Sequence, residues 1–371
     1  MKNKVVFGAI AILIVAVIAS YLWRSNPIQK NDSTSKPTIK IGATLPLTGD
    51  LAYAGIPVQK AISLSFKDIQ KSRDLKYNYE LIFEDDAMDN KKAIINYQRL
   101  KNLNNISAIL TMWNVSNVIS QQTGKDQILH MGCSWGYEPG KGRYNFNHST
   151  FPAEQVFTLI EEFKKRNIKK VGLLHNNDLV GQEIPDVLLH VLKENSIDLI
   201  FKKSFNTNER DFRLSIAQLK REDVDIVILL LQSPSMEIFM KQAKEMEYTP
   251  PLTGFDSFSY NPELFEGQWY IRDAIGTENF IKYFEEKTGE NIIACASNLY
   301  DGLNILITGF EQTSLRNSRT IPDNNDVVDT ILNMKSISNK TDSSYIDKEG
   351  NIHAEPQIEI IQNGLSVPLR K

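Results

Sequence analysis

The sequence is poor in cysteine and histidine and has no excess of positive charge. It contains two cysteines and five histidines among 371 residues, and 42 basic against 45 acidic side chains give a formal net charge of -3. Nucleic-acid-binding proteins normally carry a basic excess, so this balance argues against a nucleic-acid partner. The histidines show no metal-binding spacing, and neither a Walker A motif nor a G-x-G-x-x-G loop is present. We therefore predict no cofactor and no metal.

The two cysteines, Cys133 and Cys295, allow a single disulfide. An oxidising compartment would permit the bond, but spacing alone does not show whether the two Cα atoms come close enough to form it. Two separate buried thiols remain the alternative. Neither cysteine lies near the N-terminus, which excludes a lipid-modified N-terminal cysteine.

The first 24 residues are typical of an export signal. Lys2 and Lys4 precede an uncharged apolar run over residues 5–23. Cleavage after Ala19 would make this run a signal peptide, whereas its length also suits an uncleaved membrane anchor. Residues 25–37 are polar and lack periodicity, and we interpret them as a linker. Either fate places the rest of the chain on the outer side of the membrane, and we predict an exported protein.

Short β-branched runs alternate with helical patterns from residue 38 onward, which predicts parallel sheets covered on both faces. The expected strands are 38–45, 79–83, 107–112, 127–131, 170–175, 198–203, 225–231 and 251–254. A break over residues 141–152 separates two groups of four strands, which favours two lobes over a single (β/α)₈ barrel. We assign residues 38–150 and 276–330 to lobe 1, and residues 151–275 and 331–371 to lobe 2. A late strand over 355–362, followed by the turn Asn363-Gly364, is expected to close a sheet edge.

Open parallel sheets bind ligands at the carboxyl ends of their strands, so the loops there are the candidate site. These loops combine aromatic, hydroxyl, amide and carboxylate side chains, which suits a small ligand with apolar and charged parts. The predicted ligand-binding residues are Tyr53, Trp113, Asn114, Ser116, Ser134, Trp135, Asn177, Gln232 and Asp256. Asn114 and Ser116 stand where a helix begins and would also serve as caps.

An enzymatic alternative rests on Ser134. Residues 132–136 match G-x-S-x-G after a strand, the nucleophile-elbow pattern of α/β hydrolases. The elbow requires a helix directly after the serine, and Pro139, Gly140 and Gly142 oppose a helix there. We therefore predict that the chain is not an enzyme.

Several segments resemble the branched-chain amino-acid (Leu/Ile/Val) binding proteins, which are type I periplasmic solute-binding proteins. The opening IKIGATLPLTG at 39–49, followed by Ala54-Gly55, carries most of the likeness. Leu299-Tyr300-Asp301-Gly302 and the closing segment 345–364 resemble later parts of the family pattern, so the resemblance covers residues 38–371.

The resemblance implies two Rossmann-like lobes joined by three crossovers, with a ligand cleft between them, and an ABC permease in the inner membrane as partner. Residues 113–116 and 134–136 would then hold the ligand carboxylate, and Asp256 would receive the α-ammonium. Trp113 and Trp135 depart from the usual pattern, so an aromatic or amide ligand is also credible. A sensing module for a membrane signalling partner is the alternative to uptake.

Overall fold

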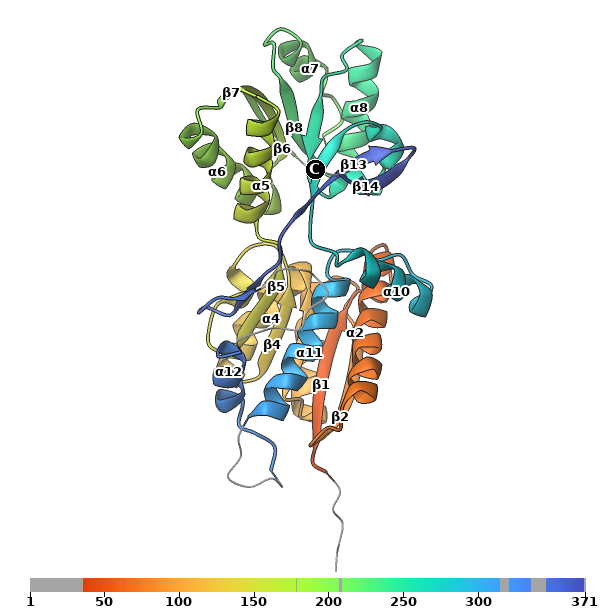
Figure 1. Ribbon diagram of the computed structural model, residues 1–371, viewed down its shortest axis with the longest axis vertical. Coiled ribbons are helices and arrows are strands. Elements are labelled where there is room, and N and C mark those ends of the chain that lie inside the picture. The colour runs from red at the N-terminus through yellow and green to blue at the C-terminus, as the bar shows by residue number, and fades with distance from the viewer. Residues whose placement is uncertain (1–35, 178, 207–208, 314–319, 335–344, 370–371) are drawn as a thin grey trace, which may run out of the picture. The chain divides into compact units, whose positions relative to one another are not determined.

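The computed structural model describes residues 36–177, 179–206, 209–313, 320–334 and 345–369 (Figure 1). The predicted export segment and nearly all of the linker lie outside these residues. Within the described residues, no helix combines the length and the apolar character needed to cross a membrane. Residues 38–371 form one compact unit, and its fold is described here.

The larger sheet has seven strands in the order β11-β12-β5-β4-β3-β1-β2. All neighbouring pairs are parallel except β11–β12. The strands are β1 (Thr38–Leu45), β2 (Asn78–Asp85), β3 (Ala108–Met112), β4 (Leu129–Cys133), β5 (Asn145–Ser149), β11 (Tyr345–Ile346) and β12 (Asn351–His353). The helices of this lobe are α2 (Ala52–Ser72), α3 (Asn90–Arg99), α4 (Trp113–Asp126), α10 (Glu278–Thr288), α11 (Ala296–Gln312) and α12 (Asn324–Leu332), with a π-helical turn at Leu100–Asn104 and a 3-10 turn at Glu138–Gly140.

Alternating side chains explain why both faces of this sheet are covered. Ile39, Ile41 and Ala43 of β1 point to the core beneath α2, α11 and α12, whereas Ile109 of β3 points to a second core with α3 and α4. Figure 1 shows α2 and α11 side by side along one face, with α12 next to α11. The predicted parallel α/β architecture is confirmed for this lobe.

The second lobe contains a four-stranded parallel sheet with the order β7-β6-β8-β9. Its strands are β6 (Lys170–Asn176), β7 (Asp198–Phe205), β8 (Ile226–Leu230) and β9 (Leu252–Gly254), and its helices are α5 (Pro152–Lys165), α6 (Leu179–Glu194), α7 (Arg213–Leu219), α8 (Ser235–Glu245) and α9 (Ser257–Tyr260), with a 3-10 turn at Pro262–Phe265. In β8, Ile226 and Ile228 pack with α5 and α6, whereas Val227 and Leu229 pack with α7 and α8. Burial on both faces accounts for the uninterrupted apolar run of this strand.

A third, antiparallel sheet consists of β10 (Trp269–Arg272), β13 (Gln357–Gln362) and β14 (Leu365–Pro368) in that order. The predicted late strand and its Asn363-Gly364 turn are confirmed, with Asn363 at φ 55° and Gly364 at φ 70°. Arg272 of β10 contacts Glu359 of β13 through Nη1 at 2.8 and 2.9 Å. The β13–β14 hairpin pairs with β10, which lies beside β9, so the hairpin belongs to the second lobe and does not extend the larger sheet.

One part of the chain pairs differently from the predicted division. We assigned residues 331–371 to lobe 2, but β12 pairs in parallel with β5 through Asn351 and Asn147, and β11 continues the same sheet. Residues 345–353 are therefore strands of the larger sheet, and the change of sheet comes between β12 and β13. These strands are too short and too polar to reveal their partner in the sequence. The other lobe boundaries stay predictions.

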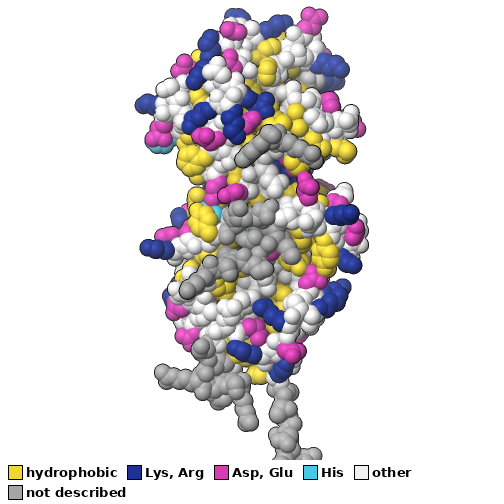
Figure 2. Space-filling model, viewed as in Figure 1, with side chains coloured by type: hydrophobic (Ala, Val, Ile, Leu, Met, Phe, Trp, Pro, Cys, Tyr) yellow, Lys and Arg dark blue, Asp and Glu magenta, His cyan; other side chains and the backbone are white. Residues whose placement is uncertain are grey.

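Side-chain charges of both signs are interspersed over the face shown in Figure 2. This mixture agrees with the near-equality of 42 basic and 45 acidic residues in the chain. A surface with interspersed charges of both signs favours solubility. It does not create a strong electrostatic field that would attract a partner of opposite charge.

Candidate functional site

Strands β1, β3 and β4 are parallel neighbours, so their carboxyl ends lie at one edge of the larger sheet. The chain leaves these strands at Leu45, Met112 and Cys133. Six predicted ligand-binding residues follow these three strand ends, namely Tyr53, Trp113, Asn114, Ser116, Ser134 and Trp135. The fold therefore brings together loops that are widely separated in the sequence.

The loop after β1 is held by a carboxylate from the neighbouring strand. Asp85, at the end of β2, accepts hydrogen bonds from the backbone N–H groups of Leu47 (2.9 Å) and Thr48 (3.2 Å) and from the Thr48 hydroxyl (2.6 Å). Burial would raise the pKa of Asp85, but these bonds and the contact with Lys92 hold it well below its usual range. Tyr53, in the first turn of α2, is 58% exposed and free to meet a ligand.

The loop after β3 passes into α4 without an intervening turn, because Trp113 adopts a left-handed conformation at φ 51°. Ser116 is buried, and its Oγ lies 2.8 Å from Thr111 Oγ1. Asn114 is exposed. Of this group, Asn114 and the free N–H groups of the first helical turn are the better placed to meet a ligand anion.

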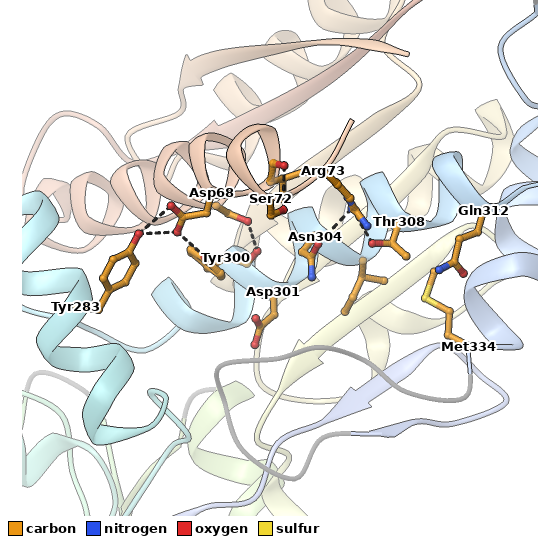
Figure 3. Close-up of a pocket in the computed structure, with 13 residues that line it drawn as sticks. Asp68, Ser72, Arg73, Tyr283, Tyr300, Asp301, Asn304, Thr308, Gln312 and Met334 are labelled. Atoms are coloured by element: carbon orange, nitrogen blue, oxygen red, sulfur yellow. Dashed lines mark hydrogen bonds between the residues drawn. The ribbon is translucent and has the colours of Figure 1, made fainter. Parts of the chain in front are cut away.

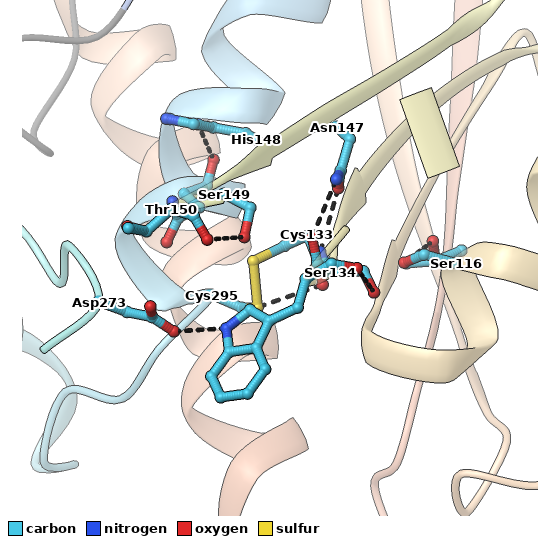
Figure 4. Close-up of a disulfide and its surroundings, with 12 residues drawn as sticks. Ser116, Cys133, Ser134, Asn147, His148, Ser149, Thr150, Asp273 and Cys295 are labelled. Carbon is cyan, nitrogen blue, oxygen red and sulfur yellow. Dashed lines mark hydrogen bonds between the residues drawn. A yellow bond between two sulfur atoms is a disulfide. The ribbon is translucent and has the colours of Figure 1, made fainter. Parts of the chain in front are cut away.

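The loop after β4 is anchored by a side chain of β5. Asn147 Oδ1 accepts the N–H of Ser134 at 3.0 Å, and Asn147 Nδ2 donates to the carbonyls of Ser134 and Gly136, both at 2.9 Å. Cys133 forms a disulfide with Cys295, the residue that precedes α11, with a Cα–Cα distance of 5.6 Å (Figure 4). The question that the sequence left open is thereby resolved, and the loop is fixed at both of its ends.

Trp135 does not present its polar edge to a ligand. Its indole Nε1 donates to Asp273 Oδ2 at 2.7 Å, and Gln155 Nε2 donates to the other carboxyl oxygen of Asp273. Asp273 follows β10, and Gln155 lies in the first turns of α5, so this network joins the β4 loop to both segments. It fixes the Trp135 ring rather than leaving it free to rotate.

Asp256 and Asp273 form a buried acid pair. Asp256 is 4% and Asp273 is 6% exposed, and Asp256 Oδ2 accepts the backbone N–H of Asp273 at 3.1 Å. Burial raises the pKa of Asp256, and burial together with the charge of Asp256 raises the pKa of Asp273 well above its usual value. The nearby Arg272 lowers the pKa of Asp256 only in part, because its guanidinium is paired with Glu359.

The remaining predicted residues lie at the strand ends of the second sheet. Asn177 follows β6, is exposed, and donates through Nδ2 to Asn206 Oδ1 at 3.0 Å. Gln232 follows β8, and its backbone N–H donates to Asn176 Oδ1 at 2.7 Å while its side chain is exposed. Because β6 and β8 are parallel, both amides lie at the same edge of their sheet.

The local structure around Ser134 does not resemble a nucleophile elbow. The chain continues into the 3-10 turn at Glu138–Gly140 instead of an α-helix, and Ser134 Oγ donates to the Trp135 carbonyl at 3.2 Å. The histidine nearest the C-terminus, His353, hydrogen-bonds to Glu154 and to Asp347, the latter at 3.0 Å. Within the described residues, no group of three or more His, Cys, Asp or Glu side chains could hold a metal.

His353 sits in an aromatic cluster where the chain passes between sheets. Its ring stacks on Tyr345 at 4.5 Å and lies 4.8 Å from Phe151, which in turn stacks on Tyr137 at 4.4 Å. Burial would lower the pKa of His353, but the contacts with Glu154 and Asp347 raise it above its ordinary value of 6.5. The His353 side chain therefore ties the start of α5 to the β11–β12 turn.

We expect the contacts of His353 with Glu154 and Asp347 to weaken as pH rises. A histidine whose folded pKa is raised contributes stability that is fully present below pH 6.5 and is lost as pH rises through the folded pKa. His353→Gln should remove up to about 1 kcal/mol of unfolding free energy at pH 6 and much less at pH 9. Urea unfolding at both pH values measures this difference. His190→Gln, at an exposed histidine beside Glu194, is the control, and an equal loss at both pH values for His353→Gln would contradict the assignment.

Sequence reasoning missed the residues that hold the candidate loops. Asp85 and Asn147 bond the loops after β1 and β4 directly. Asp273 accepts a hydrogen bond from Trp135, and Gln155 in turn donates to Asp273. Asp273 follows a strand, as the predicted residues do, but β10 was not predicted. The polar run of β5 (NFNHS) carries no apolar strand signal, although all five of its residues are buried. A buried asparagine in a strand can be recognised only when its partners are known.

Comparison with known proteins assigns the chain to a family. Residues 38–353 match the model of the periplasmic binding protein family. Curated relatives include Leu/Ile/Val-binding protein homolog 8 of Brucella abortus, 21% identical over 226 residues, and homolog 7 of the same organism, 19% identical over 237 residues. These alignments cover 57% and 60% of this chain but only 56% and 59% of the relatives, so the chain spans little more than half the length of the curated relatives it matches.

Solved structures share the fold over nearly the whole chain. A leucine-binding protein from Thermotoga maritima has a TM-score of 0.74 at 16% identity, covering 90% of this chain and 98% of its own. A branched-chain amino-acid transporter substrate-binding protein from Streptococcus pneumoniae in complex with isoleucine has a TM-score of 0.73 at 18% identity, with coverages of 89% and 99%. A solute-binding protein from R. palustris in complex with benzoate has a TM-score of 0.71 at 14% identity, with coverages of 90% and 95%.

These identities establish the two-lobed type I fold alone, and the family match rests on the sequence. Both agree with the resemblance found in the opening segment and in the closing strands. The chain belongs to the periplasmic binding protein family.

Proposed function

We propose that this protein is an extracytoplasmic solute-binding protein that captures an amino acid or a related small polar molecule for ABC-type uptake. The observation that carries the proposal is the gathering of the β1, β3 and β4 loops at one sheet edge. The half-buried Asp85 holds the β1 loop and the buried Asn147 holds the β4 loop. Loops fixed in this way bind a ligand without first becoming ordered, which lowers the entropic cost of binding. The family itself implies a location outside the cytoplasm.

In this proposal the two sets of strand-end loops close on the ligand from opposite sides of a cleft. The start of α4 and residues 134–136 receive the carboxylate, because free N–H groups at a helix start favour an anion. Tyr53, Trp113 and Trp135 supply apolar contacts, while Asn114, Asn177 and Gln232 supply amides. Ser116 hydrogen-bonds inside the lobe and contributes by supporting α4.

Asp256 is proposed as the ammonium acceptor, with Asp273 as its support. A ligand ammonium would meet the carboxyl groups of the acid pair, beside an Arg272 that is already paired with Glu359. An amine would thus gain a partner there that a simple carboxylic acid could not use. Benzoate, the ligand of one structural relative, has no such group. The acid pair therefore offers a way to distinguish amino acids from aromatic acids as ligands.

The partner in this proposal is an ABC permease of the inner membrane, reached after export through the N-terminal segment. The protein would perform no chemistry, since its relatives are binding proteins and Ser134 lacks an elbow helix. A ligand-sensing role is the second candidate. Adjacent permease and ATPase genes would favour uptake, whereas an adjacent kinase or chemoreceptor gene would favour sensing.

The test is a ligand panel followed by a substitution at the acid pair. Thermal-shift screening of amino acids and aromatic carboxylates should reveal selective stabilisation, because binding to the folded state raises the apparent melting temperature. Asp256→Asn should then weaken binding of an amine-bearing ligand about tenfold or more, as expected for losing a charged hydrogen bond. Calorimetry measures the affinity.

Two controls make this result specific. The Asp256→Asn variant should bind an aromatic carboxylate without an amine as wild type does, and the exposed Asp211→Asn in the second lobe should leave every affinity unchanged. Unchanged affinity of Asp256→Asn for every amine ligand would remove the ammonium role. A folded wild type that binds nothing in the panel would overturn the proposed function.

A further inference from the structure

Trp135 belongs to the first lobe, but its side chain packs in the second. It follows β4 of the larger sheet, yet its ring lies against the apolar cluster that α5, β8 and β10 build in the second lobe. Every other described member of that cluster comes from residues 156–271 or from β13. Trp135 is also outside the three crossovers of the chain, at residues 150–151, 273–277 and 354–356. Its contacts therefore add a link between the lobes that chain connectivity does not require.

The indole N–H of Trp135 bonds to a buried carboxyl group of the second lobe. Nε1 donates to Asp273 Oδ2 at 2.7 Å, and Gln155 Nε2 donates to the other oxygen of the same carboxyl group. Asp273 is 6% exposed and the Gln155 side chain is buried, so water competes little for these bonds. Breaking a buried hydrogen bond leaves an unsatisfied polar group, which favours keeping the indole in place.

The backbone on both sides of Trp135 is fixed to the first lobe. The buried Asn147 of β5 accepts the N–H of Ser134 at 3.0 Å and donates to the Ser134 and Gly136 carbonyls, both at 2.9 Å. These bonds enclose the one residue between Ser134 and Gly136. The Trp135 backbone therefore cannot shift to follow a movement of the second lobe.

The disulfide extends this anchor to the helices of the first lobe. Cys133 is bonded to Cys295, which directly precedes α11. Tyr300 of α11 and Tyr283 of α10 both donate to the carboxylate of Asp68 on α2, at 2.7 and 2.8 Å (Figure 3). The β4 loop is thus joined to three helices that are bonded to one another, and it moves only together with its lobe.

We propose that Trp135 is an interlobe pin, a side chain rooted in the first lobe and seated in the second that confines the two lobes to a narrow range of relative orientations. In the ligand-free protein, the ring and its N–H hold the strand-end loops at a set spacing. Wide opening would expose the ring to water and break the bond to Asp273. Closure on a ligand, in the function proposed above, is then a small movement.

The experiment measures the distance between the lobes by double electron–electron resonance, in the full chain without ligand. Spin labels are attached at Glu286→Cys on α10 and Lys241→Cys on α8, both at exposed positions, while the two native cysteines stay in their disulfide. The pinned protein should give one narrow distribution of distances. Trp135→Phe keeps an aromatic ring without the N–H and should raise the population of other distances about tenfold, as expected for losing one buried hydrogen bond. Trp135→Ala should raise it further, because the burial of the ring is lost as well.

Trp113→Phe and Trp113→Ala are the matched controls. Trp113 follows the neighbouring strand β3, and its ring packs against the apolar cluster of its own lobe. Both control variants should keep the narrow distribution of the wild type. Urea unfolding shows that each labelled variant is folded before its distances are compared.

Three results would overturn the proposal. They are a broad distribution in the wild type, an unchanged distribution in folded Trp135→Ala, and equal broadening in the Trp113 variants. No ligand enters this measurement, so a protein that binds nothing in the ligand panel would contradict the proposed function and leave the pin standing.

Discussion

Replacing both Cys133 and Cys295 with alanine is expected to lower the free energy of unfolding by about 3–5 kcal/mol. The disulfide joins residues 162 positions apart, and closing a loop of that length removes much conformational freedom from the unfolded chain. Both cysteines are buried, and the bond connects the end of β4 to the start of α11. Urea unfolding under oxidising conditions measures the loss.

The control for this prediction is the wild type unfolded in the presence of a reductant, which should reach the same stability as the double variant. Reductant should leave the double variant itself unchanged. A loss below about 1 kcal/mol would mean that the unfolded chain is already compact around the two cysteines. Because Cys133 directly precedes Ser134, the double variant should also bind any strand-end ligand more weakly.

Gly55→Ala is expected to destabilise the protein by about 3 kcal/mol or more. A Cβ at this position would lie 2.0 Å from the Pro46 carbonyl oxygen and 2.6 Å from the Pro46 carbonyl carbon. Both are backbone atoms at the end of β1, so relief requires α2 to move away from the sheet. Equilibrium unfolding in urea measures the cost.

Gly124→Ala is the matched control, since this glycine is also helical. The nearest atom to a Cβ there is Asn145 Nδ2 at 3.9 Å, so the methyl group fits. Alanine is the better helix former, and the substitution should leave stability unchanged or raise it by about 0.5–1 kcal/mol. Equal effects of the two substitutions would show that helix propensity, rather than contact with Pro46, governs Gly55.

The sequence predicted elements best where apolar residues are buried in a regular pattern. Strand β1 begins and ends at the predicted residues, and β6, β8 and β9 were placed to within one residue at each end, because their side chains meet helices on both faces. Predictions failed where polar side chains are buried. The run NFNHS of β5 and the tripeptide NIH of β12 are strands because the two segments pair in parallel within the larger sheet, with Asn351 opposite Asn147.

The candidate site shows the same division. The rule that ligand-binding loops follow strand ends correctly identified loops that share a sheet edge, since neighbouring parallel strands end on the same side. The rule did not predict which side chains within a loop are exposed to a ligand. Ser116 turns inward to Thr111, Trp135 donates to Asp273, and Asp256 lies against Asp273, whereas Tyr53, Asn114 and Gln232 remain exposed.

The order of apolar and polar residues by itself determined the α/β class and the parallel sheets, because burial on two faces leaves a periodic record in the chain. The family followed from the resemblance carried by the opening segment 39–49 and the later motifs. Only the tertiary structure decided the disulfide, the sheet that receives residues 345–353 and the partners of each polar side chain. The disulfide between Cys133 and Cys295 and the hydrogen bond from Trp135 to Asp273 join residues more than a hundred positions apart. A local pattern carries no information about such contacts, because each partner is specified elsewhere in the chain.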